Sequence, residues 1–158
     1  MIARFAKDQS GAAFIEFGIM LPMLLLLFGV AVEGTRTFWS YQTTLTGVRE
    51  AARYLSRAVD ANICATGGST TAWDPTLGAI VRESLSGEAL IPSGVSVGQV
   101  SSTLTCTASG FRGGLVGVAT VTASLSISLP FSGLFTQSGE NKAGLSTSIS
   151  DSARVLGR

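Results

Sequence analysis

One acidic side chain, Glu16, lies inside a long apolar stretch of this sequence. From Ala12 to Val32 every residue is apolar or glycine, apart from Glu16 and Pro22. A helix of this length spans the roughly 30 Å hydrocarbon core of a bilayer. A carboxylate inside such a helix costs about 2.5–3.5 kcal/mol at the bilayer centre and less near an interface. Glu16 therefore indicates either a site that pairs with a cation or an interfacial helix start, where the helix dipole favours an acid.

The residues that usually carry catalysis are scarce. Histidine is absent from the 158-residue chain, and the two cysteines, Cys64 and Cys106, both follow the apolar stretch. A Ser-His-Asp or Cys-His apparatus cannot be built without histidine, and a zinc site would have to rely on cysteine and carboxylate ligands. We therefore predict no catalytic residues, no metal site and no cofactor. The cysteines are expected to form a disulfide in an oxidising compartment, with two unpaired buried thiols as the alternative.

Composition limits the domain organisation. Hydrophobic residues make up 46% of the chain and charged residues 13%, and the formal net charge is +1. These values allow one membrane helix and one modest soluble domain. They provide no basic field of the kind that nucleic-acid binders use, so we predict no nucleic-acid partner.

The elements that position these residues begin with one long helix. Beyond Val32, apolar side chains recur every three or four residues, which predicts that the helix continues to about residue 60 with one buried face. A free-standing coiled coil is the alternative, but the stripe is short and contains Gly47. Pro22 cannot donate a hydrogen bond to the carbonyl of Gly18, which predicts a kink across Gly18 and Pro22. The predicted stripe is Phe38, Tyr41, Leu45, Val48, Ala52, Leu55 and Val59.

The C-terminal part of the sequence alternates like a sheet. Residues 64–73 read as a loop, and Asp74-Pro75 predicts the N-cap and first turn of a short helix that ends near Gly87. Residues 95–108, with a bulge at Gly98, then residues 120–129 and residues 145–149 predict strands. The predicted fold is α+β, with the long helix packed on a small antiparallel sheet of about three strands and one short extra helix.

The N-terminal pattern resembles a class III, prepilin-type signal. A short polar segment that carries Arg4 and Lys7 ends at Gly11, and Glu16 is the fifth residue after this glycine. Together with Phe17, the leucine-rich run and the sequence Val48-Arg49-Glu50-Ala51-Ala52-Arg53-Tyr54, the pattern resembles the TadE-like minor pilins (pseudopilins) of the tight-adherence, Flp-type (type IV) pilus system. The resemblance is strong from Gly11 to Tyr54 and extends beyond it only in general shape.

The resemblance implies a pilin-like organisation. Residues 1–11 would be a leader that prepilin peptidase removes between Gly11 and Ala12. Residues 12–60 would form the long helix, transmembrane over about residues 12–32, and residues 61–158 an extracytoplasmic globular domain. Glu16 and Phe17 would serve subunit assembly, with Glu16 pairing with the freed α-amino group of a neighbouring subunit. That amine is largely protonated at neutral pH, and opposite charges attract strongly at low dielectric.

The same resemblance implies partners and a location. The partners would be prepilin peptidase, other Tad pseudopilins, the major Flp pilin, the inner-membrane secretion platform and membrane lipid. The protein would be a single-pass protein of the bacterial inner membrane, available for incorporation in the pilus. Major Flp pilins are little more than the helix, so the additional domain favours a minor, structural role in pilus assembly and cell adhesion.

Two other interpretations stay open on the sequence. The residues Gly29-Val30-Ala31 resemble a signal-peptidase site, which would release a secreted adhesion or binding module. The apolar run is longer than a usual signal core and contains Glu16, which disfavours that interpretation. The third is a single-pass anchored protein of another role. The mature N-terminus distinguishes the three, since it would be Ala12, Val32 or Met1.

Overall fold

The computed structural model describes residues 11–83, 91, 94–108, 114–129 and 144–157. The predicted leader lies outside these residues except for Gly11, as does the predicted helix end near Gly87. The α+β class, with one long helix, a three-stranded antiparallel sheet and a short helix, is confirmed. In chain order the elements are α2 (Ala12–Ala58), α3 (Ile63–Thr66), the 3-10 helix η1 (Thr71–Trp73), α4 (Asp74–Arg82), β1 (Val95–Ala108), β2 (Leu115–Ser128) and β3 (Gly144–Arg154).

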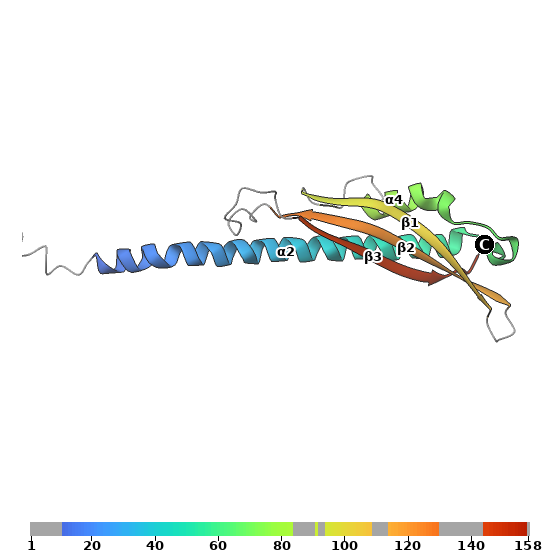
Figure 1. Ribbon diagram of the computed structural model, residues 1–158, viewed down its shortest axis with the longest axis horizontal. Coiled ribbons are helices and arrows are strands. Elements are labelled where there is room, and N and C mark those ends of the chain that lie inside the picture. Colours follow the sequence, from blue (N-terminus) through green and yellow to red (C-terminus); the bar gives the residue numbers. More distant parts are fainter. Residues whose placement is uncertain (1–10, 84–90, 92–93, 109–113, 130–143, 158) are drawn as a thin grey trace, which may run out of the picture.

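The long helix α2 has two halves with different surroundings. Figure 1 shows the sheet lying along the C-terminal half of α2, while the N-terminal half extends beyond the rest of the fold. The helix is continuous through Pro22 over its 47 residues. It ends where Val59 turns to an extended conformation and donates its N–H to the carbonyl of Leu55, at 3.2 Å. The kink predicted across Gly18 and Pro22 stays a prediction.

The sheet has the order β1-β2-β3, with β2 in the centre and both pairings antiparallel. The predicted alternation along β2 is confirmed from Val121 to Ile127, where the apolar side chains are buried and the intervening threonine and serines are not. This apolar face packs against α2, so the helix stripe and the sheet face bury each other. The buried side chains that β2 contributes to the core are Ala119, Val121, Ala123, Leu125 and Ile127.

The bulge predicted at Gly98 is also confirmed. Val97 pairs with Leu125 and Val100 pairs with Ala123, so two residues of β1 lie opposite one residue of β2. Arg82, at the end of α4, supports this irregularity. Its Nε donates to the carbonyl oxygen of Val97 at 3.2 Å, and its Nη2 donates to the carbonyl oxygen of Gly98.

The buried face of α2 differs from the predicted stripe at its start. Phe38 and Tyr41 were expected to be buried, but their side chains are 65% and 39% exposed. Ser40, Thr44 and Gly47 occupy the buried face instead. From Val48 to Val59 the prediction is correct, since the predicted residues Val48, Ala52, Leu55 and Val59 are all buried.

Two features allow small and polar residues to form this face. Ser40 Oγ donates to the carbonyl oxygen of Arg36 at 2.8 Å, and Thr44 Oγ1 donates to that of Ser40 at 2.9 Å. Both hydroxyls are therefore satisfied within the helix, which removes the cost of burying them. At Gly47 a Cβ would lie 3.1 Å from the Cα and carbonyl oxygen of Val81, so α2 and α4 approach closely because that residue is glycine.

The short helix α4 begins differently from the prediction. Asp74 is the first residue of α4 rather than its N-cap, which is Trp73 and makes no side-chain capping bond. Asp74 Oδ1 instead accepts hydrogen bonds from the N–H and Oγ of Ser102, at 2.9 and 2.6 Å. The carboxylate thus links α4 to strand β1. The stretch predicted as a loop, residues 64–73, contains most of α3 and the whole of η1.

Candidate membrane helix and assembly surface

The N-terminal half of α2 presents an apolar surface that the folded domain does not cover. From residue 11 to residue 32 every residue is exposed except Gly29. The most apolar 18-residue window of α2 has a mean hydropathy of 2.3 and is only 6% buried. The core helix of a soluble protein would be mostly buried, and this helix is not. Its length and composition suit a membrane span. The large side chains of this half that are more than 60% exposed are Phe14, Ile15, Phe17, Ile19, Met23, Leu27 and Phe28.

The predicted processing site lies where the helix begins. Gly11 is the N-cap residue of α2, Ala12 is its first helical residue, and both are exposed. The carbonyl oxygen of Gly11 accepts the first helical hydrogen bond, from the N–H of Ile15 at 3.3 Å. A Cβ added at Gly11 would meet no atom within 4 Å. No side chain of the described residues therefore crowds Gly11 on its Cβ side.

The predicted assembly residues lie one turn further along. Glu16 and Phe17 are exposed, and Phe17 is 61% accessible. Ala12 and Glu16 are four residues apart in a helix, so they are neighbours on one face. Gly18 and Pro22 are also exposed. The structure thus groups these residues on one uncovered helix segment, away from the core of the domain.

A second acid follows the apolar run. Both carboxylate oxygens of Glu33 are buried and have no hydrogen-bond partner in the part of the chain that the structure describes. Glu33 lies one turn after Gly29, the single buried residue of the apolar half. Because helical side chains lean toward the preceding turn, the Glu33 side chain extends toward Gly29. Sequence reasoning missed this residue, although an acid at the end of an apolar run was the available signal.

The predicted cysteine pair is joined at the other end of the fold. Cys64 in α3 and Cys106 in β1 form a disulfide with a Cα–Cα distance of 5.7 Å. Gly117 lies opposite Cys106 across the β1–β2 ladder, and a Cβ there would come within 3.1 Å of Cys64 Sγ. A glycine on the central strand therefore leaves room for the bridge that joins α3 to the edge strand β1.

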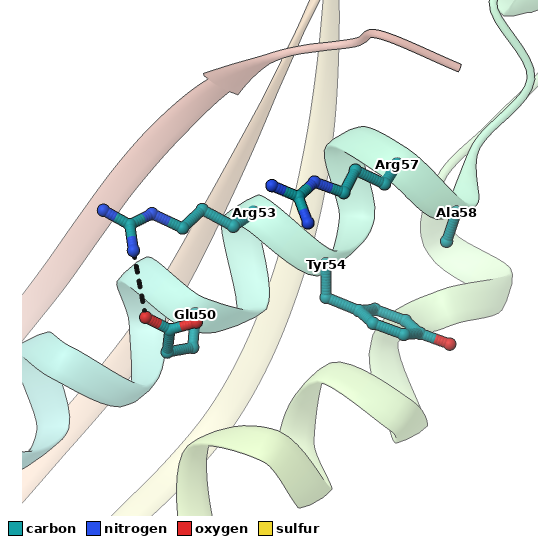
Figure 2. A pocket seen from close by; sticks show the side chains of 5 residues that line it. All are labelled: Glu50, Arg53, Tyr54, Arg57 and Ala58. Carbon is teal, nitrogen blue, oxygen red and sulfur yellow. Dashed lines mark hydrogen bonds and ion pairs between the residues drawn. The ribbon is translucent and has the colours of Figure 1, made fainter. Parts of the chain in front are cut away.

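A shallow pocket of about 470 Å³ lies over the C-terminal turns of α2, lined by Glu50, Arg53, Tyr54, Arg57 and Ala58. Figure 2 shows the ion pair between Arg53 and Glu50 and the Tyr54 ring directed away from it. The two charged atoms are 3.1 Å apart, and the side chains are 67% and 57% exposed. Because water screens such a pair, it contributes only a few tenths of a kcal/mol. The Tyr54 ring instead packs edge-on against Trp73, with ring centroids 6.0 Å apart.

This pocket has the chemistry of a solvated helix surface. Among the described residues, no three side chains of His, Cys, Asp or Glu lie close enough together to hold a metal ion.

Comparison with known proteins found a family model that resembles the N-terminal part of the chain. Residues 11–53 match the family model described as TadE-like protein. The matched segment contains Gly11, Ala12, Glu16 and Phe17, and it ends within the domain-covered half of α2. Neither a curated protein nor a solved structure was found to match the chain.

Proposed function

We propose that this chain, with its TadE-like N-terminal segment, is a minor pilin or pseudopilin that acts as a structural component in the assembly of a Tad/Flp-type pilus. The observation that carries the proposal is the uncovered apolar half of α2, which bears Glu16 and lies within the matched residues 11–53. Such a surface needs either lipid or the helices of other subunits around it. In this proposal the helix spans the bacterial inner membrane and the C-terminal domain lies outside the cytoplasm.

The proposed processing step creates the charge that assembly uses. Prepilin peptidase would hydrolyse the exposed Gly11–Ala12 bond and leave an α-amino group on Ala12, largely protonated at neutral pH. Within one subunit this amine would lie one helical turn from Glu16. In an assembly, Glu16 would accept the amine of a neighbouring subunit instead. The two charges then offset each other's desolvation inside the apolar bundle.

The proposed partners are those that the likeness to TadE-like proteins implies. Prepilin peptidase acts on the N-terminal junction, and the other Tad pseudopilins, the major Flp pilin and the inner-membrane secretion platform contact the helix or the domain above it. We propose Gly18 and Pro22 as the turn at which the helix loosens during assembly, because Pro22 leaves the Gly18 carbonyl without its helical donor.

The secreted alternative gains no support from the described geometry. The small residues Gly29, Val30 and Ala31 lie in the interior of α2, which runs without interruption from Ala12 to Ala58. Cleavage after Ala31 would therefore divide the longest helix of the fold.

Processing is tested by determining the mature N-terminus in a bacterium that has prepilin peptidase. The expected N-terminus is Ala12. A Gly11→Val variant should stay uncleaved, whereas the control Gly18→Val should be cleaved normally. Both glycines have open space within 4 Å, so neither valine causes a clash with the fold. A mature N-terminus at Val32, or an intact leader on the wild-type protein, contradicts the proposal.

Assembly is tested separately with Glu16→Ala and Glu16→Gln. Both variants should insert into the membrane and be processed, yet both should lose incorporation into pili or pseudopilin complexes. The control Glu50→Gln removes an exposed acid from the covered half of the same helix and should assemble normally. Co-purification with the other pseudopilins is the measurement. Normal assembly of Glu16→Ala would remove Glu16 from the mechanism.

A further inference from the structure

Three exposed aromatic residues lie on α2 just beyond its apolar half. Phe38 is 65% exposed, Trp39 is 68% exposed and Tyr41 is 39% exposed. We call these residues the aromatic collar. Between them lies Ser40, whose side chain is 1% exposed and faces the core of the domain. The collar therefore occupies the part of α2 where the domain begins to cover one side of the helix.

The collar faces more than one direction at one height along the helix. Successive residues of an α-helix are rotated by about 100°, so Trp39 lies about 100° around the helix from Phe38, whereas Phe38 and Tyr41, spaced by three, share one face. A single partner helix contacts one stripe of residues spaced by three or four. A surrounding medium contacts all the sides of the helix that the domain leaves free. This arrangement favours lipid over one protein partner as the surface that meets the collar.

A groove connects the collar to the apolar run. It has a volume of about 470 Å³ and is lined by Ala31, Val32, Thr35, Arg36 and Trp39. Its lower end, at Ala31 and Val32, is the end of the apolar run, and its upper end is the indole of Trp39. The guanidinium of Arg36 lies beside Gly94, just before β1, so it belongs to the contact between α2 and the domain. The groove is thus apolar below, with an amphipathic ring above, which matches the order of acyl chain and glycerol region in a phospholipid.

The helix rise places this groove in the outer headgroup layer. Ala12 to Val32 spans about 30 Å, the thickness of the hydrocarbon core. Trp39 follows Val32 by about two turns, or roughly 10 Å along the axis. Helical side chains lean back toward the N-terminus by about a turn, so the indole lies roughly 5 Å beyond Val32. The headgroup layer of a bilayer is about 5–7 Å thick on each side, so the indole falls within it.

We propose that the aromatic collar and its groove bind phospholipids of the outer leaflet and set the depth at which the protein rests in the membrane. This inference depends on the membrane insertion that the proposed function assumes, and goes beyond it by assigning a lipid-contact site. The domain, whose burial on α2 begins at Ser40, then rests on the headgroups. A subunit held at this depth keeps its N-terminal end at the cytoplasmic interface, where the Gly11–Ala12 bond is reached by a peptidase.

The two tryptophans of the chain allow a direct test. The full-length Trp73→Phe variant retains Trp39 as its single tryptophan, and Trp39→Phe retains Trp73, which packs against Tyr54 in the domain. Each variant is reconstituted in vesicles of phosphatidylethanolamine and phosphatidylglycerol with bromine atoms placed either near the ester groups or near the chain ends. Flotation of the vesicles reports insertion, and fluorescence quenching reports depth.

The expected result is a loss of most Trp39 fluorescence with bromines near the ester groups, a much smaller loss with bromines near the chain ends, and no loss for Trp73. If the protein floats with the vesicles but Trp39 is quenched no more than Trp73, the collar does not contact lipid and this inference is wrong, while the proposed membrane anchor stands. If Trp39 is quenched most strongly from the chain ends, the depth assignment is wrong. If the protein does not float, both the inference and the proposed membrane role fail.

Discussion

Removal of the disulfide between Cys64 and Cys106 should lower the free energy of unfolding of the domain substantially. The bridge closes a segment with a sequence separation of 42 residues, which contains η1 and α4 and ends in β1. In the chain-entropy model, closing a loop of this length restricts the unfolded chain by about 4 kcal/mol at 25 °C. Typical domains have total stabilities of about 5–15 kcal/mol, so this is a large fraction.

The structure indicates where the loss would act. Cys64 lies in the four-residue helix α3, whose neighbouring side chain Ile63 is 8% exposed and belongs to the core. A helix of this length has no independent stability, so its position depends on that packing and on the bridge. The apolar half of α2 is remote from the bridge in sequence and makes no contribution to it. We therefore expect destabilisation of the domain with no loss of helicity in the apolar half.

Urea unfolding of the full chain in detergent micelles, followed by near-UV circular dichroism, measures this effect. Cys64→Ala, Cys106→Ala and the double variant should lose the same amount, about 4 kcal/mol, because each removes the one covalent link between these residues. Reduction of the wild type should reproduce that loss, with thiol titration confirming two free thiols. A fully reduced wild type that unfolds within about 1 kcal/mol of the oxidised protein would refute the assignment.

Two further predictions concern the contacts of α4. Gly47→Val should destabilise the domain by about 1–3 kcal/mol, because its Cβ would lie 3.1 Å from the backbone of Val81, whereas Gly34→Val, with nothing within 4 Å, should cost little by urea unfolding. Asp74→Ala should cost about 1–3 kcal/mol, because the N–H and hydroxyl of the buried Ser102 lose their acceptor. Asp74→Asn keeps an acceptor oxygen and should recover part of that loss in the same assay. Equal stability of the two Asp74 variants would contradict the hydrogen-bond account.

The sequence predicts the elements well where one physical signal dominates. The alternation of β2 could be predicted because one face is apolar and the other consists of serine and threonine. The bulge could be predicted because Gly98 interrupts the alternation of β1. The extent of α2 followed from a helical period that runs without a break. The disulfide followed from two cysteines that both lie after the apolar segment. Each of these signals is local or depends on a small number of residues.

The sequence does not predict the details that depend on distance between elements. Phe38 and Tyr41 fit the spacing of the predicted apolar stripe. The domain nevertheless begins to cover α2 at Ser40, which lies on a different face of the helix. Which face is buried depends on the close approach of α4 at Gly47, and that approach selects small residues rather than large apolar ones. The hydrogen bonds of Arg82 and Asp74 could not be predicted either, because their partners lie 15 and 28 residues away in the sequence, in β1. For Gly11 and Glu16, the sequence predicts only their positions at the start of the long helix.

The apolar half of α2 can be covered either by lipid or by the helices of other subunits, and Glu16 distinguishes the two. Acyl chains remove apolar side chains from water as well as the helices of other subunits do, so Phe14, Ile15 and Leu27 do not discriminate between lipid and protein. Acyl chains offer no counter-charge and no hydrogen-bond donor, so an acid facing them gains nothing to offset its desolvation. A neighbouring subunit with a freed α-amino group offers both. Because Glu16 lies one turn from the residue that would carry that amine, every subunit would contain both the donor and the acceptor. In the proposed function, one cleavage would therefore equip each copy both to give and to receive the same contact, which is the requirement for a head-to-tail, repeating assembly.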